Sequence, residues 1–423
     1  GVNIPIKYLL VTSLRVGSEM VKARDFQNLI GRTARAGIYT EGSIIITDSK
    51  IYDGRKIYKG GRKYLWDNCM RLLDMKYSEP CSSSILSLVQ DIEIDYEHLI
   101  KGEKFVEKLL EHFDEDGFLM KYAITLQKKY LEQYPNKGQN TIVQQFLLRQ
   151  DILNHIENYI CLVYSLDIDV DKNIKRIENI YENTLAYALA TEQEKELLNK
   201  VFLKIKEKVE KYSIAQLHKY SNAMSGIDRS IQIEQWIIDN RLTEQFLSEQ
   251  DLLSLSIGLY FQLCNDIKYK NDLNNVKEYI NICQNWIKGK TPLEIESQSR
   301  KTMWEIDDIC SKRISYELNF LIGNICDLIY VDEDDETQVD PRNQLILLQK
   351  KIKYGVSNMT AISVCETIFN DRLLSMKIAQ ILCDENIGTD KILKRIKSKR
   401  DIVFNVLKDY PGCFEDRLKL LLR

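Results

Sequence analysis

A helical spacing of apolar residues runs from Tyr64 to the end of the chain and constrains the fold more than any other feature. One clear stretch has apolar residues at four-residue intervals: Leu197, Val201, Ile205 and Val209. This spacing places them on one face of a helix, which can pack against a core. Just before this stretch, Thr191-Glu-Gln-Glu resembles a helix-start signal with a capping acid. Only six prolines and eighteen glycines occur in 423 residues, so few positions favour a helix break. The sequence therefore predicts a mainly α protein with a large all-helical region.

The first fifty residues follow a different pattern. Tyr8–Thr12 and Ser43–Thr47 are short, continuous apolar runs. Such runs are typical of strands buried on both faces of a parallel sheet, and a helix is expected between them. Because two strands do not make an independent sheet, we expect an α/β domain whose start lies outside this sequence. The chain is thus predicted to be a fragment of a longer protein.

A glutamine, a glycine and two arginines stand at fixed offsets in the segment 26–37, which reads FQNLIGRTARAG. They are Gln27, Gly31, Arg32 and Arg35. On a helix the two arginines would lie about one turn apart on one face. Two planar guanidinium groups side by side suit a phosphate group, because each offers several N–H donors and keeps its charge. The alternative is that both arginines are ordinary surface residues.

This spacing closely resembles motif VI of superfamily 2 (DEAD/DEAH-type) helicases. Residues 1–6, GVNIPI, are similar to the end of motif V in the Ski2-like branch of that superfamily, and the order of motifs and strands also fits. The resemblance covers residues 1–50 and implies the C-terminal end of a RecA-like α/β lobe, followed by helical domains. Among such proteins, the helicase subunits of bacterial anti-phage defence systems of the Hachiman type are one candidate.

The resemblance implies an ATP-hydrolysing motor. Arg32 and Arg35 would act as arginine fingers on the γ-phosphate, Gln27 would position that phosphate, and Gly31 would lie beside the nucleotide. Relatives often have Gly-Arg-Ala-Gly-Arg where this chain has Gly-Arg-Thr-Ala-Arg, so the arginine spacing is kept and the second glycine is not. No Walker A or Walker B pattern is found, so a missing N-terminal lobe would bind most of the ATP and Mg²⁺. The fragment alone is expected to be inactive.

Two segments are predicted to contact nucleic acid. By resemblance, Val2, Asn3 and Pro5 belong to an element that touches the nucleic-acid backbone. Near the other end, a helix is predicted over Thr389–Asp409, and five cations lie within its seven residues 394–400. Four of them are the expected phosphate contacts: Lys394, Arg395, Lys397 and Arg400. Such a helix can track phosphates, although a solvated face explains the same pattern equally well. The expected ligand is single-stranded or partly duplex nucleic acid, with DNA favoured over RNA.

Three domains are expected. Residues 1–60 would end the second RecA-like lobe, residues 61–190 would form a helical domain with a winged-helix-like fold as one candidate, and residues 191–423 would form a C-terminal helical domain. In the last region, Tyr354-Gly355 and Phe369-Asn-Asp-Arg372 resemble a feature of bacterial Ski2-like helicases. We favour a packing role for it, with Gly355 ending one helix and Asp371 starting another.

Composition excludes several classes of protein. No run approaches the ~20 apolar residues of a membrane span, so no membrane partner is expected. Ten scattered cysteines without a C-x-x-C pair indicate reduced thiols in a cytoplasmic protein. Four well-separated histidines give no metal-ligand spacing, and no metal site is predicted. An independent hydrolase is disfavoured because no nucleophile–base constellation is found.

Two other functions stay open. In the first, the helical region is a scaffold that docks a partner, for example a nuclease subunit, and the arginine motif is a non-catalytic remnant. In the second, the parent protein is an accessory ATPase that remodels nucleic acid–protein complexes without separating strands. Strand displacement by the full-length parent would distinguish a helicase from the second alternative.

Overall fold

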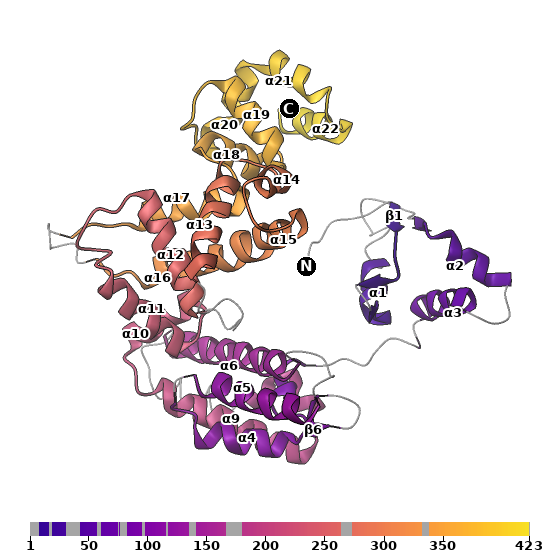
Figure 1. The fold of residues 1–423 in the computed structure, drawn as a ribbon, viewed down its shortest axis with the longest axis vertical. Helices are drawn as coiled ribbons and strands as arrows, with labels where there is room; N and C mark the ends of the chain where they lie inside the picture. The colour runs from indigo at the N-terminus through magenta and orange to yellow at the C-terminus, as the bar shows by residue number, and fades with distance from the viewer. Residues whose placement is uncertain are drawn as a thin grey trace. The chain divides into compact units, whose positions relative to one another are not determined.

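The computed structural model describes residues 8–16, 19–30, 43–56, 61–74, 76, 83–94, 98–115, 117–134, 141–165, 180–263, 273–331 and 338–422. Helix accounts for 73% of the structure and strand for 4%, which confirms the predicted mainly α class. The chain divides into two compact units, Gly1–Ser83 and Ser84–Arg423 (Figure 1). Each unit is described by itself below.

The N-terminal unit is built around a pair of parallel strands. Strands β1 (Tyr8–Val11) and β4 (Ser43–Ile46) pair in the register Tyr8↔Ser43 to Val11↔Ile46. The chain between them includes the short hairpin of β2 (Arg15–Val16) and β3 (Glu19–Met20) and the helix α1 (Ala23–Ile30). After β4 come α2 (Ser49–Asp53), η1 (Gly54–Lys56) and α3 (Gly61–Leu73). The strand–helix–strand order and the parallel pairing were both predicted.

The burial predicted for these strands is wrong within the described structure. Tyr8 and Leu10 are each 59% exposed, and Ile45 is 45% exposed. Only the inner face is covered, by a small core of seven buried residues from β1, α1, α2, α3 and the loop after β1: Val11, Leu14, Ala23, Phe26, Ile51, Cys69 and Leu72. Each strand is also one residue shorter than predicted. The pair thus has an apolar face that no described residue covers.

Helix α3 belongs to the N-terminal unit, although residue 61 was predicted to begin a separate helical domain. Its buried residues Cys69 and Leu72 pack in the same core as Phe26 of α1. The unit therefore ends at Ser83 and not at residue 60. The physical reason is that α3 needs an apolar surface to cover its buried face, and α1 and α2 provide it.

Where the structure describes it, the second unit is helical apart from one two-stranded hairpin. The strands of that hairpin are β5 (Ile92–Glu93) and β6 (Leu99–Ile100). The first helices are η3 (Ile85–Leu88), α4 (Gly102–Glu111), α5 (Phe118–Gln133), α6 (Thr141–Ser165), η4 (Tyr181–Asn183), α8 (Leu185–Leu189), α9 (Glu192–Val209), α10 (Ile214–Ala223), α11 (Ile227–Asp239) and α12 (Glu249–Leu263). The later ones are α13 (Leu273–Ile287), α14 (Pro292–Glu296), α15 (Met303–Asp308), η5 (Ile309–Leu318), α16 (Asn319–Leu328), α17 (Arg342–Tyr354), α18 (Met359–Thr367), α19 (Arg372–Leu382), α20 (Thr389–Ser398), α21 (Arg400–Leu407) and α22 (Gly412–Leu421).

One large hydrophobic core runs through most of this unit, from Leu86 to Ile352. It crosses the boundary predicted at residue 190, because α6 packs against both α9 and α10. The C-terminal helices α18 to α22 form two smaller cores around buried residues such as Phe369 and Ile362. Helix α17 contributes to the large core and to one of the smaller cores.

Local capping signals in the sequence set several of these helix starts. Thr191 accepts the backbone N–H of Glu194 while the Glu194 carboxylate accepts the backbone N–H of Thr191, which is the capping box expected from this segment. The same reciprocal pattern starts α10 at Ser213 and α15 at Thr302. None of the helices that the structure describes is long and apolar enough to cross a lipid bilayer.

Candidate functional site

Gln27 is the predicted nucleotide-site residue that the structure describes. It lies on α1, whose buried residues Ala23 and Phe26 hold the helix against the N-terminal core. The Gln27 side chain is half-buried, and its Nε2 atom is inaccessible to water and has no hydrogen-bond partner among the described residues. An unpaired buried donor costs about 1–3 kcal/mol of stability. The residues that cover this atom would have to move before an acceptor from another molecule could reach it.

The other residues predicted for the nucleotide site lie outside the described residues. These are Gly31, Arg32 and Arg35, and the same holds for the predicted nucleic-acid contacts Val2, Asn3 and Pro5. The described elements fix what comes before and after the arginine segment: α1 ends at Ile30, and β4 begins at Ser43. The motif therefore begins on the helix that connects two parallel strands.

Four predicted phosphate-binding cations are brought together near the C-terminus. Lys394, Arg395 and Lys397 are exposed on α20, and Arg400 is exposed at the start of α21. No described acidic side chain forms an ion pair with any of the four. On its other face, α20 buries Ile392 and Ile396 completely, which orients the cations toward solvent.

The prediction of a single helix over 389–409 is wrong. The helix is interrupted at Lys399, which separates α20 from α21. The backbone of Lys399 leaves the helical region at φ −119° and ψ 27°. Its ammonium group donates a 2.7 Å hydrogen bond to the carbonyl of Ile381 at the end of α19. Lys399 therefore fixes the packing of α20, while Arg400 on the next helix lies over the ring of Phe404.

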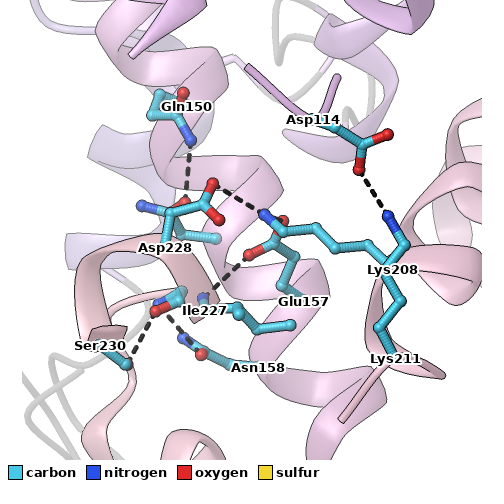
Figure 2. A network of polar contacts seen from close by, with 11 residues as sticks. Asp114, Gln150, Glu157, Asn158, Lys208, Lys211, Ile227, Asp228 and Ser230 are labelled. Carbon is cyan, nitrogen blue, oxygen red and sulfur yellow. Dashed lines mark hydrogen bonds and ion pairs between the residues drawn. The ribbon is translucent and has the colours of Figure 1, made fainter. Parts of the chain in front are cut away.

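A buried ion triad in the helical unit was not predicted. The Lys208 ammonium on α9 lies 2.8 Å from Glu157 Oε1 on α6 and 2.8 Å from Asp228 Oδ2 on α11, as Figure 2 shows. The Lys208 and Glu157 side chains are 8% and 5% exposed, whereas Asp228 is 46% exposed. The three residues are far apart in the sequence, so no local spacing could have indicated the triad.

The same network holds the start of α11. The backbone N–H of Ile227 donates to Glu157 Oε2 at 3.1 Å, and that of Gly226 donates to Asn158 Oδ1 at 3.2 Å. Gly226 has φ +82°, and a Cβ there would lie 2.7 Å from the side chain of Asn154. A glutamate and an asparagine of α6 thus satisfy N–H groups that a helix start leaves unpaired.

Electrostatics in the triad favour a structural role. Burial raises the pKa of Glu157 despite the nearby cation. Burial lowers the pKa of Lys208, but the carboxylates of Glu157 and Asp228 more than reverse this effect, so its pKa is raised. The adjoining cleft has a volume of only about 40 Å³, which is too small for a substrate. We conclude that the triad joins α6, α9 and α11.

A larger cavity of about 890 Å³ opens between α6, α9 and the short helices η3 and η4. Its lining is mostly apolar and includes Ile152, Val163 and Phe202, with Asp151 and His155 on one side. The Nδ1 atom of His155 is engaged by the backbone carbonyl of Asp151 at 2.6 Å. Ser84, Tyr159 and Thr184 also line the cavity, but among the described residues no hydrogen bond joins their hydroxyls to His155 or Asp151, so no nucleophile–base pair is formed there.

The feature at Tyr354–Arg372 has the packing role that we favoured. Gly355 ends α17 with φ +63°, and a Cβ there would lie 2.5 Å from the Trp286 ring. Asp371 starts α19 by accepting the backbone N–H of Leu374 at 2.8 Å. Arg372 then stacks on Trp286. The feature therefore joins three helices and is confirmed as structural.

Among the described residues no cluster suits a metal ion, and burial suppresses the ionisation of two cysteine thiols. No group of three or more His, Cys, Asp or Glu side chains among the described residues could hold a metal ion. Burial raises the pKa of Cys310 to about 12 and that of Cys161 to about 12, so both thiols stay protonated at neutral pH.

Neither a scan against protein-family models nor a search of curated proteins finds a match to this chain. The helicase resemblance therefore depends on the motifs and on the geometry that surrounds them.

Proposed function

We propose that this chain forms the C-terminal part of an ATP-dependent helicase or translocase that acts on nucleic acid. In this proposal the N-terminal unit, residues 1–83, ends a RecA-like lobe, and the helical unit holds the strand being moved. The observation that carries the proposal is the parallel pairing of β1 with β4, with α1 and the arginine motif in the connection between them. A strand–helix–strand crossover is the unit from which such lobes are built.

The exposed apolar faces of the two strands support the same proposal. Parallel strands are normally covered on both faces, yet Tyr8, Leu10 and Ile45 are open to solvent. Further strands and helices of a complete lobe would cover them. The missing N-terminal lobe of the proposal would supply most of the contacts to ATP and Mg²⁺.

The residues fit one wall of a nucleotide site. The unpaired Nε2 donor of Gln27 matches an anionic oxygen, and two arginines follow it in the sequence. ATP would supply the phosphoryl group that is transferred to water. Arg32 and Arg35 would stabilise the charge that develops on that group, which is typically worth about 10³–10⁵ in rate. Gln27 would orient the same group through its amide.

The exposed cations of α20 and α21 are the proposed contact to the nucleic-acid backbone. Lys394, Arg395, Lys397 and Arg400 can each neutralise a phosphate and release a counterion. Because they contact only the backbone, binding by this surface would be independent of sequence. Single-stranded DNA is the ligand to test first, with RNA as the comparison.

Nucleic-acid-stimulated ATP hydrolysis by the longer protein that contains this chain tests the proposal. Arg32→Ala and Arg35→Ala should each lower the stimulated rate by at least about 10³. Arg15→Ala is the matched control, because Arg15 is exposed on β2 of the same unit. ATP turnover that is unaffected by either motif substitution would contradict the assignment of the fingers.

A scaffold function remains the second candidate, favoured by aromatic side chains on the surface of the helical unit. Trp304 is 76% exposed and Tyr316 is 72% exposed, and aromatic residues of this kind are enriched at protein interfaces. Two results together would support this candidate. The unmutated protein would show no ATP turnover, and the chain with both arginines mutated would still bind a nuclease subunit.

A further inference from the structure

An exposed stripe of side chains runs along the helix formed by α15, η5 and α16. The helix is continuous from Met303 to Leu328, and its central segment η5 is π-helical. At the end of η5 the backbone N–H of Asn319 donates to the carbonyl of Ile314, five residues earlier. One face is buried in the large core through Ile306, Cys310 and Ile314. The stripe lies on the opposite face.

The stripe contains residues at four-residue intervals: Trp304, Asp308, Lys312 and Tyr316. In an α-helix, each four-residue step advances by about 40° around the axis, so such residues drift off a common face. A π turn contains more residues, and the same step falls slightly short of a full turn. The change from α to π geometry after Asp308 therefore cancels the drift and keeps the four side chains aligned.

All four side chains are open to solvent. Trp304 is 76% exposed and Tyr316 is 72% exposed. Between them, Lys312 Nζ lies 2.7 Å from Asp308 Oδ1, and these two side chains are 73% and 47% exposed. The order along the stripe is thus aromatic, acidic, basic, aromatic.

When a second copy of the stripe runs in the opposite direction, each acidic residue faces a basic one and each aromatic residue faces an aromatic one. We propose that the stripe is a homodimer interface, in which two copies of the helix pack antiparallel about a two-fold axis beside Cys310. Trp304 of each copy then meets Tyr316 of the other, and Asp308 meets Lys312. Each contact occurs twice, as a two-fold axis requires. The four charges form a closed network, and offset aromatic pairs lie at its two ends.

A nucleic acid is a poorer occupant of the same surface. Two cations on this helix, Lys312 and Arg313, are outnumbered by four acidic residues nearby: Glu305, Asp307, Asp308 and Glu317. A polyanion would be repelled by that excess, whereas a second copy brings its own cations to the acids. The stripe therefore differs in kind from the basic surface on α20 and α21.

Sedimentation velocity of the full chain over about a hundredfold range of concentration tests the proposal, since a small interface gives a weak dimer. Asp308→Lys and Lys312→Asp each place like charges opposite one another, and each should weaken self-association at least about tenfold. When the two variants are mixed, one copy of each can pair, and opposite charges then face each other again at both contacts.

Dimerisation that is lost in each variant alone and restored in the mixture supports the interface, and the restoration shows that both variants are folded. Trp304→Ala should weaken association as well. Phe246→Ala is its matched control, because Phe246 is 74% exposed and lies in the loop before α12 rather than on this helix. A chain that stays monomeric throughout, a dimer that survives Asp308→Lys, or a mixture that stays monomeric would overturn the proposal.

Discussion

The Cζ atom of Arg372 lies 3.7 Å from the centroid of the Trp286 ring, so the guanidinium group lies over the face of the indole. Its Nη2 atom also donates to the carbonyl of Lys290, and the indole Nε1 donates to the carbonyl of Ile352 at 2.8 Å. These contacts tie the first residues of α19 to the end of α13 and the last turn of α17. One stacked pair thus connects the C-terminal helices to the large core.

Arg372→Lys should destabilise the helical unit despite keeping the charge. An ammonium group cannot stack flat on Trp286 and donate to a carbonyl beyond the ring, so about 2 kcal/mol should be lost from the free energy of unfolding. Urea unfolding followed by circular dichroism measures this. Arg395→Lys on the exposed face of α20 is the control and should change stability by less than about 0.5 kcal/mol. Equal effects at both positions would contradict the role of the stack.

Two glycine substitutions should have opposite effects. Gly355→Ala places a Cβ 2.5 Å from the Trp286 ring at φ +63° and should cost more than about 1 kcal/mol. Gly258 lies inside α12 with open space around its Cβ position, so Gly258→Ala should stabilise by about 0.5–1 kcal/mol. The midpoints of thermal unfolding should move in opposite directions. A fall in both would show that the environment of Gly258 is not open.

Breaking the buried triad should cost far more than breaking the exposed ion pair beside it (Figure 2). Lys208→Met leaves the Glu157 carboxylate buried without its cation and should remove about 3–5 kcal/mol. Lys211→Met removes the pair of Lys211 and Asp114, whose side chains are both more than half exposed, and should cost less than about 1 kcal/mol. Denaturant unfolding of both variants makes the comparison. A similar cost for both would mean that water reaches the triad.

Combining Lys208→Met with Glu157→Met should restore part of the stability, because no unpaired charge is then buried. Asp228 is 46% exposed and can remain solvated. The recovery should be incomplete, since the backbone N–H of Ile227 loses its acceptor. A double variant that is as unstable as the sum of the two single variants would argue against a direct pair.

Stability should fall in acid partly through Asp91. Its carboxylate accepts hydrogen bonds from Lys101 Nζ at 2.8 Å and from the backbone N–H of Gly102 at 2.9 Å, and these bonds lower its pKa. A carboxyl with a lowered pKa in the folded state stabilises above its ordinary pKa of about 3.9 and loses this effect as the pH falls below it. Asp91→Asn should therefore lower the melting temperature at pH 7 and change it much less at pH 3. An equal change at both pH values would contradict the assignment.

Features with a local signal were predicted from the sequence. Apolar spacing identified the amphipathic helix with Val201 and Ile205, and the Thr191 capping box set its start. Two continuous apolar runs identified the two parallel strands, although the two-sided burial inferred from them was wrong because one face of each strand is exposed. Gly355 was predicted to end a helix and Asp371 to start one. Both are confirmed, because Gly355 has left-handed backbone angles after α17 and Asp371 has an extended backbone before α19.

Features that depend on distant parts of the chain were missed. Glu157, Lys208 and Asp228 come from three helices, and nothing near each residue indicates its partners. The break at Lys399 was missed because the apolar spacing continues through it, whereas the bond from Lys399 to Ile381 that accompanies the break is long-range. The π geometry of Ile309–Leu318 also leaves the apolar spacing close to that of an α-helix.

Helix α17 has a consequence for how the second unit unfolds. Leu345, Leu348 and Ile352 lie in the large core, while Leu347 and Tyr354 of the same helix pack on the smaller core around Ile362. Unfolding of either core would expose one side of α17, and the other core depends on this helix for its packing. Residues 84–422 should therefore unfold cooperatively, in one transition seen alike by tryptophan fluorescence and by far-ultraviolet circular dichroism.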